Sequence, residues 1–306
     1  RYNVVDLRAG DYVVTFTLPG FNAFRRDGIE LTAGFTATVN AEMRVGAIEE
    51  TITVSGAAPL VDTQSVRKQA VVTSETLQAL PTGNRGIVSF IALTPGLTGP
   101  ADVGGTVGGQ RSMSGQTTLY RGRASGKINL DGMAVLNPTG TGNASYVVNA
   151  AVVEEMVLET GGISAESAAS GFAFNAIPKE GGNAFKFIAS GRYTNSDLQS
   201  DNSSDELRKR GLSTVDSVIK IHDGSVSLGG PIQRDRLWFF GAYRNWGNKN
   251  IIGGVFWNKT QGTPLYTPDL SRPSDRLEFY RSHAVRMTWQ ATPRNKVSFF
   301  GDKQNN

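Results

Sequence analysis

Residues 185–194 read FKFIASGRYT, and this stretch decides the fold of the C-terminal part of the chain. In an extended strand successive side chains point to opposite faces, so residues two apart share a face. The alternation here predicts a β-strand with one apolar and one polar face. The apolar face holds Phe185, Phe187, Ala189, Gly191 and Tyr193, and the other holds Lys186, Ser190, Arg192 and Thr194.

The same alternation recurs through residues 183–306, where all four Trp lie. Val285, Met287 and Trp289 alternate with Arg286, Thr288 and Gln290. We expect further strands at 217–228, 235–246 and 296–300, a turn at Gly229-Gly230-Pro231, and long polar loops at 195–210 and 247–276.

Two architectures fit this pattern. Short turns that alternate with long polar loops, between strands apolar on one face, are typical of an outer-membrane β-barrel. A soluble β-sandwich has the same period of two, and its aromatic residues would then form the core. The pattern alone leaves both open.

The rest of the chain has a different character. Residues 1–56 contain short strands near 12–18, 28–31, 35–43 and 51–54, with a turn at Pro19-Gly20, and read as part of a small β-sandwich. Residues 57–182 mix helix and strand: Ser74 is an expected N-cap for a helix at 75–80, and strands are expected at 127–130, 154–160 and 171–177.

Composition excludes several classes of protein. The chain of 306 residues has no Cys and two His, so thiolate zinc sites, disulfide frameworks and Cys nucleophiles are excluded. The net charge is 31 − 27 = +4, which does not favour a nucleic-acid partner. The stretch 122–127 (GRASGK) is one residue short of a P-loop and continues with Ile128 instead of Ser or Thr. We expect no catalytic residue, no cofactor and no bound metal.

Eight short motifs follow one another along the chain. They are Ala79-Leu80-Pro81 with Asn84-Arg85, Leu93-Thr94-Pro95-Gly96, Ile128-Asn129-Leu130-Asp131-Gly132, 153–161, Ser164-Ala165-Glu166, 175–185, Leu228-Gly229-Gly230-Pro231-Ile232, and 235–240 (DRLWFF). In this order they resemble a TonB-dependent outer-membrane receptor of the Oar-like branch, where they would lie in the plug, at its exit, and in the early barrel.

The resemblance implies a mainly β fold in three parts. Residues 1–45 would end a carboxypeptidase-regulatory-like, prealbumin-like β-sandwich, and 46–56 would be a linker. Residues 57–182 would form the α+β plug domain, and 183–306 the first strands of a large transmembrane β-barrel. Full barrels of this kind have on the order of 22 strands, so these 124 residues are expected to form an incomplete, open sheet.

The resemblance also implies a function. The protein would take up or pass a large substrate across the outer membrane of a Gram-negative cell, with the plug and the N-terminal domain on the periplasmic side. Its partners would be TonB, which delivers energy, the outer-membrane lipid and an unidentified substrate. A secreted or cell-surface β-rich adhesion protein without transport stays open as the alternative, and a secreted hydrolase lacks a visible catalytic set.

Two segments carry the expected site residues. The TonB-interaction candidates are Glu49, Glu50, Thr51, Ile52, Thr53 and Val54, an extended, Pro-free run of the kind that adds as a strand to a partner. The alternative is that Thr51 to Val54 are a strand of the sandwich or plug. In the glycine-rich loop 99–115, Gln110 and Arg111 could face substrate, although packing against the barrel wall is the favoured interpretation.

The polar faces of the barrel strands suggest one more contact. Lys186, Arg192 and Arg286 would point into the lumen. There they would pair with plug carboxylates such as Glu154 or Glu155 across a hydrated interface.

Overall fold

The computed structural model describes most of the chain, which divides into two compact units, residues 1–71 with 157–164 and residues 72–156 with 165–306. Among the described residues, no helix combines the length and the apolar character needed to cross a membrane. The described residues are 2–5, 7, 10–46, 51–54, 68–79, 94–98, 119–121, 126–135, 146–163, 171–201, 203–212 and 215–305.

The N-terminal sheet has the order β1-β2-β3. β1 (Gly10–Phe16) and β2 (Ala23–Leu31) are antiparallel across the expected turn, where Gly20 has a φ of +85°. β3 (Thr51–Val54) runs parallel to β2, with Ala23 opposite Thr51. The strands predicted from the sequence near 12–18, 28–31 and 51–54 are therefore confirmed.

The strand expected at 35–43 is wrong. These residues alternate between exposed and half-buried, as an extended chain does, but they belong to no β-ladder. The alternation of Thr and apolar residues records an extended backbone. It does not record whether a neighbouring strand is there to pair with it.

The central sheet has the order β4-β9-β10-β7-β8. α1 (Ser74–Ala79) follows β4 directly, and Thr73, not Ser74, accepts the hydrogen bond from the N–H of Thr76, so the expected N-cap is one residue too late. The 3-10 helix η1 (Ala150–Val152) precedes β9, and β5 (Leu97–Thr98) pairs separately with β6 (Leu119–Tyr120). The strands are β4 (Lys68–Thr73), β7 (Lys127–Leu130), β8 (Met133–Ala134), β9 (Val153–Gly161) and β10 (Ala173–Pro178).

The middle strands of the central sheet hold its core. Parallel pairing of β10 with β7 places Phe174 opposite Ile128, and both side chains are buried. A side chain at position 126 would overlap the ring of Phe172, so glycine is required there. Other buried apolar residues of this core are Leu130, Val152, Val153, Met156 and Ala176.

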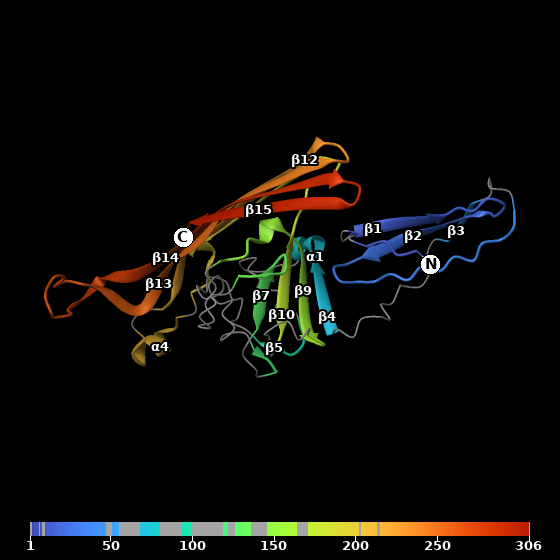
Figure 1. Cartoon of the computed structure of the whole chain (residues 1–306). Coiled ribbons are helices and arrows are strands. Elements are labelled where there is room, and N and C mark those ends of the chain that lie inside the picture. The colour runs from blue at the N-terminus through green and yellow to red at the C-terminus, as the bar shows by residue number, and fades with distance from the viewer. Residues whose placement is uncertain are drawn as a thin grey trace. The chain divides into compact units, whose positions relative to one another are not determined.

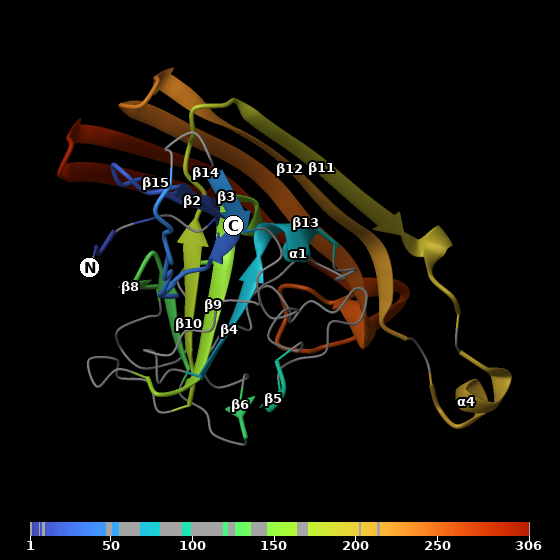
Figure 2. The same ribbon diagram turned by 90° about the vertical axis from the view of Figure 1, so that its right-hand side faces the viewer.

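The C-terminal sheet is one open, antiparallel layer in the order β11-β12-β13-β14-β15 (Figure 1). In the view turned by 90° about the vertical axis, its long strands curve as a group (Figure 2). The segment 196–216 between β11 and β12 holds the short helices η2 (Ser196–Leu198) and α4 (Asp205–Lys209), and Ser204 caps α4. The strands are β11 (Lys186–Asn195), β12 (Ser217–Gln233), β13 (Leu237–Asn258), β14 (Pro268–Thr292) and β15 (Asn295–Asn305).

The turn expected at Gly229-Gly230-Pro231 is wrong, because all three residues belong to β12. The turn lies at 234–236, where Asp235 has a φ of +59°. β11 begins at Lys186 opposite Gly229, so Pro231 lies beyond the end of β11 and needs no N–H on that side. Gly230 leaves room for the ring of Phe185. Gly230 and Pro231 are therefore compatible with a continuous strand.

The long polar loop expected at 247–276 is also wrong. β13 and β14 pair as far as Asn258 opposite Pro268, which leaves a connection of only 259–267. Register irregularities between Ile251 and Trp257 let the strands continue through a polar stretch. Apart from this connection, the polar residues of 247–276 lie in β-strands whose two faces both contact water, and they do not indicate a loop.

The two faces of the C-terminal sheet are inverted relative to those of a soluble protein. Arg286 and Thr288 on β14 are 5% and 1% exposed, whereas Val285 and Met287, which alternate with them, are 43% and 40% exposed. β13 repeats this with buried Arg244 and Asn248. A sheet that buries its polar face and exposes its apolar face is suited to contact with lipid on the apolar face.

Candidate functional site

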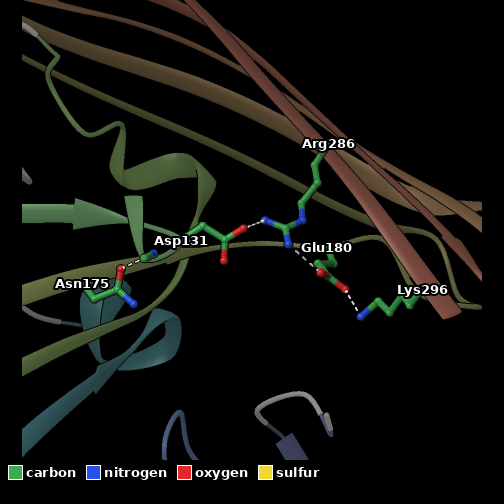
Figure 3. Close-up of polar contacts among 6 residues, drawn as sticks. Asp131, Asn175, Glu180, Arg286 and Lys296 are labelled. Atoms are coloured by element: carbon green, nitrogen blue, oxygen red, sulfur yellow. Dashed lines mark hydrogen bonds and ion pairs between the residues drawn. The ribbon is translucent and has the colours of Figure 1, made fainter. Parts of the chain in front are cut away.

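The buried, polar face of the C-terminal sheet meets the central sheet through charged residues (Figure 3). Arg286 of β14 donates from Nη1 to Asp131 Oδ2 and from Nη2 to Glu180 Oε1, both at 2.8 Å. Lys296 Nζ of β15 lies 3.1 Å from the other Glu180 oxygen, Oε2. The Arg286 side chain is 6% exposed, so its charge depends on these two carboxylates for compensation.

A tight hairpin holds Asp131 in place. Asp131 and Gly132 connect β7 to β8 with φ of +52° and +79°, as an Asp-Gly type I′ turn requires. The backbone N–H of Asp131 donates to Ala176 O at 2.8 Å, and that of Gly132 donates to Asn175 Oδ1 at 2.9 Å. The carboxylate therefore sits on a rigid corner of the central sheet, visible in Figure 3.

A second cluster joins the segment before η1 to β14 and β15. The fully buried Asn149 donates from Nδ2 to Ser282 Oγ at 2.9 Å, and Ser282 donates to Asp302 Oδ1 at 2.8 Å. Tyr146 donates its hydroxyl to Asp302 Oδ2 at 2.6 Å. Burial, followed by the hydrogen bond to Asp302 and its charge, raises the pKa of Tyr146 well above its usual range.

The same cluster includes a two-way bond with the backbone. Gln304 of β15 donates from Nε2 to Val147 O at 2.6 Å and accepts from Val147 N at 3.1 Å through Oε1. Because the Gln304 amide pairs with both backbone groups of Val147, it fixes the position of the segment before η1 along β15.

The exit from the central sheet into β11 is fastened to the β12–β13 turn. Asn183 Oδ1 accepts from Trp238 Nε1 at 2.7 Å and from the N–H of Asp235 at 3.0 Å, and its Nδ2 donates to Asp235 Oδ1. A Cβ at Gly181 would overlap the carbonyl oxygen of Phe239, so only glycine allows this approach. These contacts hold the exit segment against the β12–β13 turn.

A further charged pair lies within the buried face of the sheet itself. Arg244 forms two hydrogen bonds of 2.9 Å to the carboxylate of Asp223 on the neighbouring strand. Its guanidinium also lies 4.3 Å from the ring centroid of Trp246, which stacks on Tyr280 at 5.4 Å. This stack sits beyond the Arg286 cluster in the direction of the longer loops.

The contacts described above between the two sheets are hydrogen bonds and ion pairs, donated and accepted by groups that water can also satisfy. Because these groups can bond to water when the surfaces separate, the net contribution of each hydrogen bond is smaller than its strength in isolation. Each buried charge nevertheless needs its partner while the sheets are in contact.

The structure tests the expected lumenal contacts in part. Arg286 does face inward and does pair with carboxylates of the expected plug range 57–182, as predicted. Its partners are Asp131 and Glu180, not Glu154 or Glu155. The Asp-Gly turn was a signal for a fixed carboxylate at 131, and sequence reasoning did not use it.

The other expected site residues are only partly within the described chain. Thr51, Ile52, Thr53 and Val54 form β3, which matches the alternative that they are a strand of the N-terminal sheet. Their use by TonB is not tested by this placement. Glu49, Glu50, Gln110 and Arg111 lie outside the described residues.

Comparisons with known proteins agree with this architecture. No protein-family model matches the chain. The chain is 28% identical over 251 residues to the TonB-dependent transporter Oar of Myxococcus xanthus, a match that covers 79% of this chain and 22% of that protein. The chain thus spans about a fifth of the length of this relative.

Solved outer-membrane proteins share the fold. The siderophore receptor PirA from Acinetobacter baumannii has a TM-score of 0.50 and 21% identity, over 77% of this chain and 31% of that one. The outer membrane transporter YddB from Escherichia coli has a TM-score of 0.52 and 14% identity, over 77% of this chain and 33% of that one. The chain is therefore similar in sequence to a TonB-dependent transporter, and it has the fold of these solved receptors and transporters.

Proposed function

We propose that this chain works in a TonB-dependent outer-membrane receptor that takes up, or passes, a large substrate. The observation that carries the proposal is the inverted C-terminal sheet, with Phe187 68% and Phe299 62% exposed outside and Arg286 buried inside. Lipid on the outside and a polar domain on the inside explain both faces at once. The secreted adhesion alternative explains neither the buried arginine nor the Oar-like sequence.

The parts of the chain take their roles from this proposal. Residues 1–45 end a carboxypeptidase-regulatory-like domain, 46–56 link it to the plug at 57–182, and 183–306 begin the barrel. The location is the outer membrane of a Gram-negative cell. The plug and the N-terminal domain lie on the periplasmic side, where the short turns at 234–236 and 293–294 also lie.

TonB engages the segment from Glu49 to Val54. β3 is the terminal strand in the order β1-β2-β3, which supports strand addition by a partner at its outer edge. A short edge strand of four residues is also easily detached. Either way, the contact uses backbone N–H and C=O groups and tolerates many side chains.

The polar interface supports movement of the plug under force. Arg286 and Asn149 take part in two separate contacts between the plug and the C-terminal sheet, and each contact can exchange to water when the plug shifts. A named relative, PirA, is a siderophore receptor, and a solute of that size is compatible with this proposal. The substrate that we propose for this chain is a large solute.

Cell fractionation of the natural gene product tests the proposal. We expect it in the outer membrane, with the change in gel mobility on boiling that β-barrels show, and copurifying with TonB. Recovery of the protein in the culture medium or in a soluble fraction would overturn the receptor and favour the adhesion protein.

A further inference from the structure

The outward face of the C-terminal sheet changes character along its strands. On β14, counted from the short turn, Trp289, Met287 and Val285 are followed by His283 and then Arg281. The neighbouring strand β15 places Lys303 opposite His283 and Asn305 opposite Arg281. Apolar side chains thus give way to a basic group made of Arg281, His283 and Lys303, which we call the basic row.

The basic row has no acidic neighbour on its face. From the short turns as far as Phe279, no outward position of β11 to β15 is Asp or Glu, and all of these positions lie in described residues. Arg281 and Lys303 are diagonal neighbours across the strand pair, at a typical separation of about 7–8 Å. Like charges at this distance repel, so an anion between them is favoured.

The position of the basic row along the strands indicates a level in the membrane, an argument that rests on the proposed function. A membrane-spanning strand needs about 9–11 residues. Counted from the turn, Lys303 is the ninth residue of β15 (303 − 295 + 1), and Arg281 is the twelfth of β14 (292 − 281 + 1). The row therefore lies near the far edge of the hydrocarbon layer, where lipid headgroups begin.

A shallow depression of about 750 Å³ lies on the same face beside the basic row. Its floor is formed where Gly191 pairs with Gly224, and a Cβ at Gly191 would meet nothing within 4 Å. Tyr243 lines the depression, and its ring lies 4.9 Å from that of His283. Asn245, also in the lining, is paired with Arg281.

We propose that the basic row binds the phosphate of a membrane lipid on the outer surface of the barrel. Arg281 and Lys303 supply the charge, His283 and Asn245 supply further hydrogen bonds, and an acyl chain of the lipid occupies the depression over Gly191 and Gly224. The lipid phosphate replaces the acidic partner that this face lacks.

Lipid titration of the natural gene product in detergent, followed by native mass spectrometry, tests the site. The probes are dioctanoyl phosphatidic acid, dioctanoyl phosphatidylcholine and inorganic phosphate. We expect selective binding of phosphatidic acid, and roughly 30-fold weaker binding after the double change Arg281→Gln with Lys303→Gln, from two lost basic residues near a membrane surface. Arg281→Lys with Lys303→Arg should keep the affinity within a few-fold.

Lys209→Gln with Arg210→Gln, in the segment between β11 and β12, removes the same charge elsewhere and should bind like the unchanged protein. If the double Gln variant no longer shows the barrel mobility shift, Lys303→Gln alone should bind roughly 5-fold more weakly. Equal binding by the unchanged and Gln proteins, or equal binding of both lipids, overturns the site. Full competition by inorganic phosphate also overturns it, in favour of a free-anion site.

The site and the receptor fail separately in these experiments. A protein absent from the outer membrane overturns the receptor itself. A membrane-inserted protein with unselective lipid binding overturns only the lipid site.

Discussion

At the scale of single residues, Arg286 is the most consequential contact between the two sheets. Arg286→Gln removes the cation that pairs with Asp131, and it leaves Glu180 with Lys296 alone. Loss of one partner from a buried pair costs about 3–5 kcal/mol, and because Asp131 is 37% exposed we expect the lower end, roughly 3 kcal/mol. Urea unfolding of the natural gene product in detergent, followed by limited proteolysis of the central domain, measures the loss.

Arg208→Gln is the control, in the segment between β11 and β12. Arg208 pairs with Asp201 at 3.6 Å, the two side chains are 57% and 66% exposed, and exposed pairs contribute less than about 1 kcal/mol. Equal unfolding midpoints for the two variants would mean that the Arg286 cluster does not fasten the central sheet to the wall.

Tyr146 provides a test by pH. Because its folded pKa is raised above the ordinary value of about 10, its stabilising contribution is complete below pH 10 and is lost as pH rises beyond that. In the difference between the unchanged protein and Tyr146→Phe, absorbance at 295 nm should show no phenolate near pH 10 while the protein stays folded. A step near pH 10 in that difference would show a phenol open to solvent.

The sequence predicted the inward direction of Arg286 but not its partners. Alternation along a strand settles which face a residue occupies, because the period of two is local. Asp131 and Glu180 are separated from Arg286 by 155 and 106 residues, and such pairings depend on how whole sheets meet. Short-range patterns carry no information about them.

At the scale of elements, strand existence was predicted better than strand length. Each expected strand of the C-terminal zone is present, yet β12 continues through Gly229-Gly230-Pro231, and β13 and β14 continue through a polar stretch. Pro ends a strand where neighbouring strands on both sides need its backbone N–H, and Gly ends a strand where a side chain is needed for packing. The first condition does not hold for Pro231, which lies beyond the end of β11.

Gly230 tests this account of β12. Gly230→Ala would place a methyl group against the ring of Phe185, and overpacking of this kind costs about 1–3 kcal/mol. Gly241→Ala is the control in the adjacent strand, because its new Cβ meets only Ala284 O at 3.9 Å. Thermal unfolding of both variants should separate them, whereas a turn at 229–231 would make Gly230→Ala as harmless as the control.

β3 offers a test of energy coupling. Ile52→Pro removes a backbone N–H from the proposed TonB-interaction strand and should abolish copurification with TonB, while Ile52→Val keeps the backbone and the β-branched side chain. Both variants should reach the outer membrane in equal amounts. If Ile52→Pro copurifies with TonB like the unchanged protein, the segment Glu49 to Val54 is not the TonB contact, and β3 is only a strand of the N-terminal sheet.

At the scale of the whole molecule, the inverted sheet separates a membrane protein from a soluble one. Phe187 is 68% exposed on the outward face of β11, and Leu265 is 71% exposed in the 259–267 connection. In a bilayer, a Lys on the lipid face costs about 2–4 kcal/mol at mid-depth and little outside the membrane. Phe187→Lys should therefore lower the amount of heat-modifiable protein in the outer membrane several-fold, and Leu265→Lys should not. For a soluble β-sandwich the two exposed positions are equivalent, and both lysines would leave yield unchanged or improve solubility. Equal recovery of the two variants from the outer membrane would thus contradict a lipid-facing β11, even if the protein itself were membrane-associated.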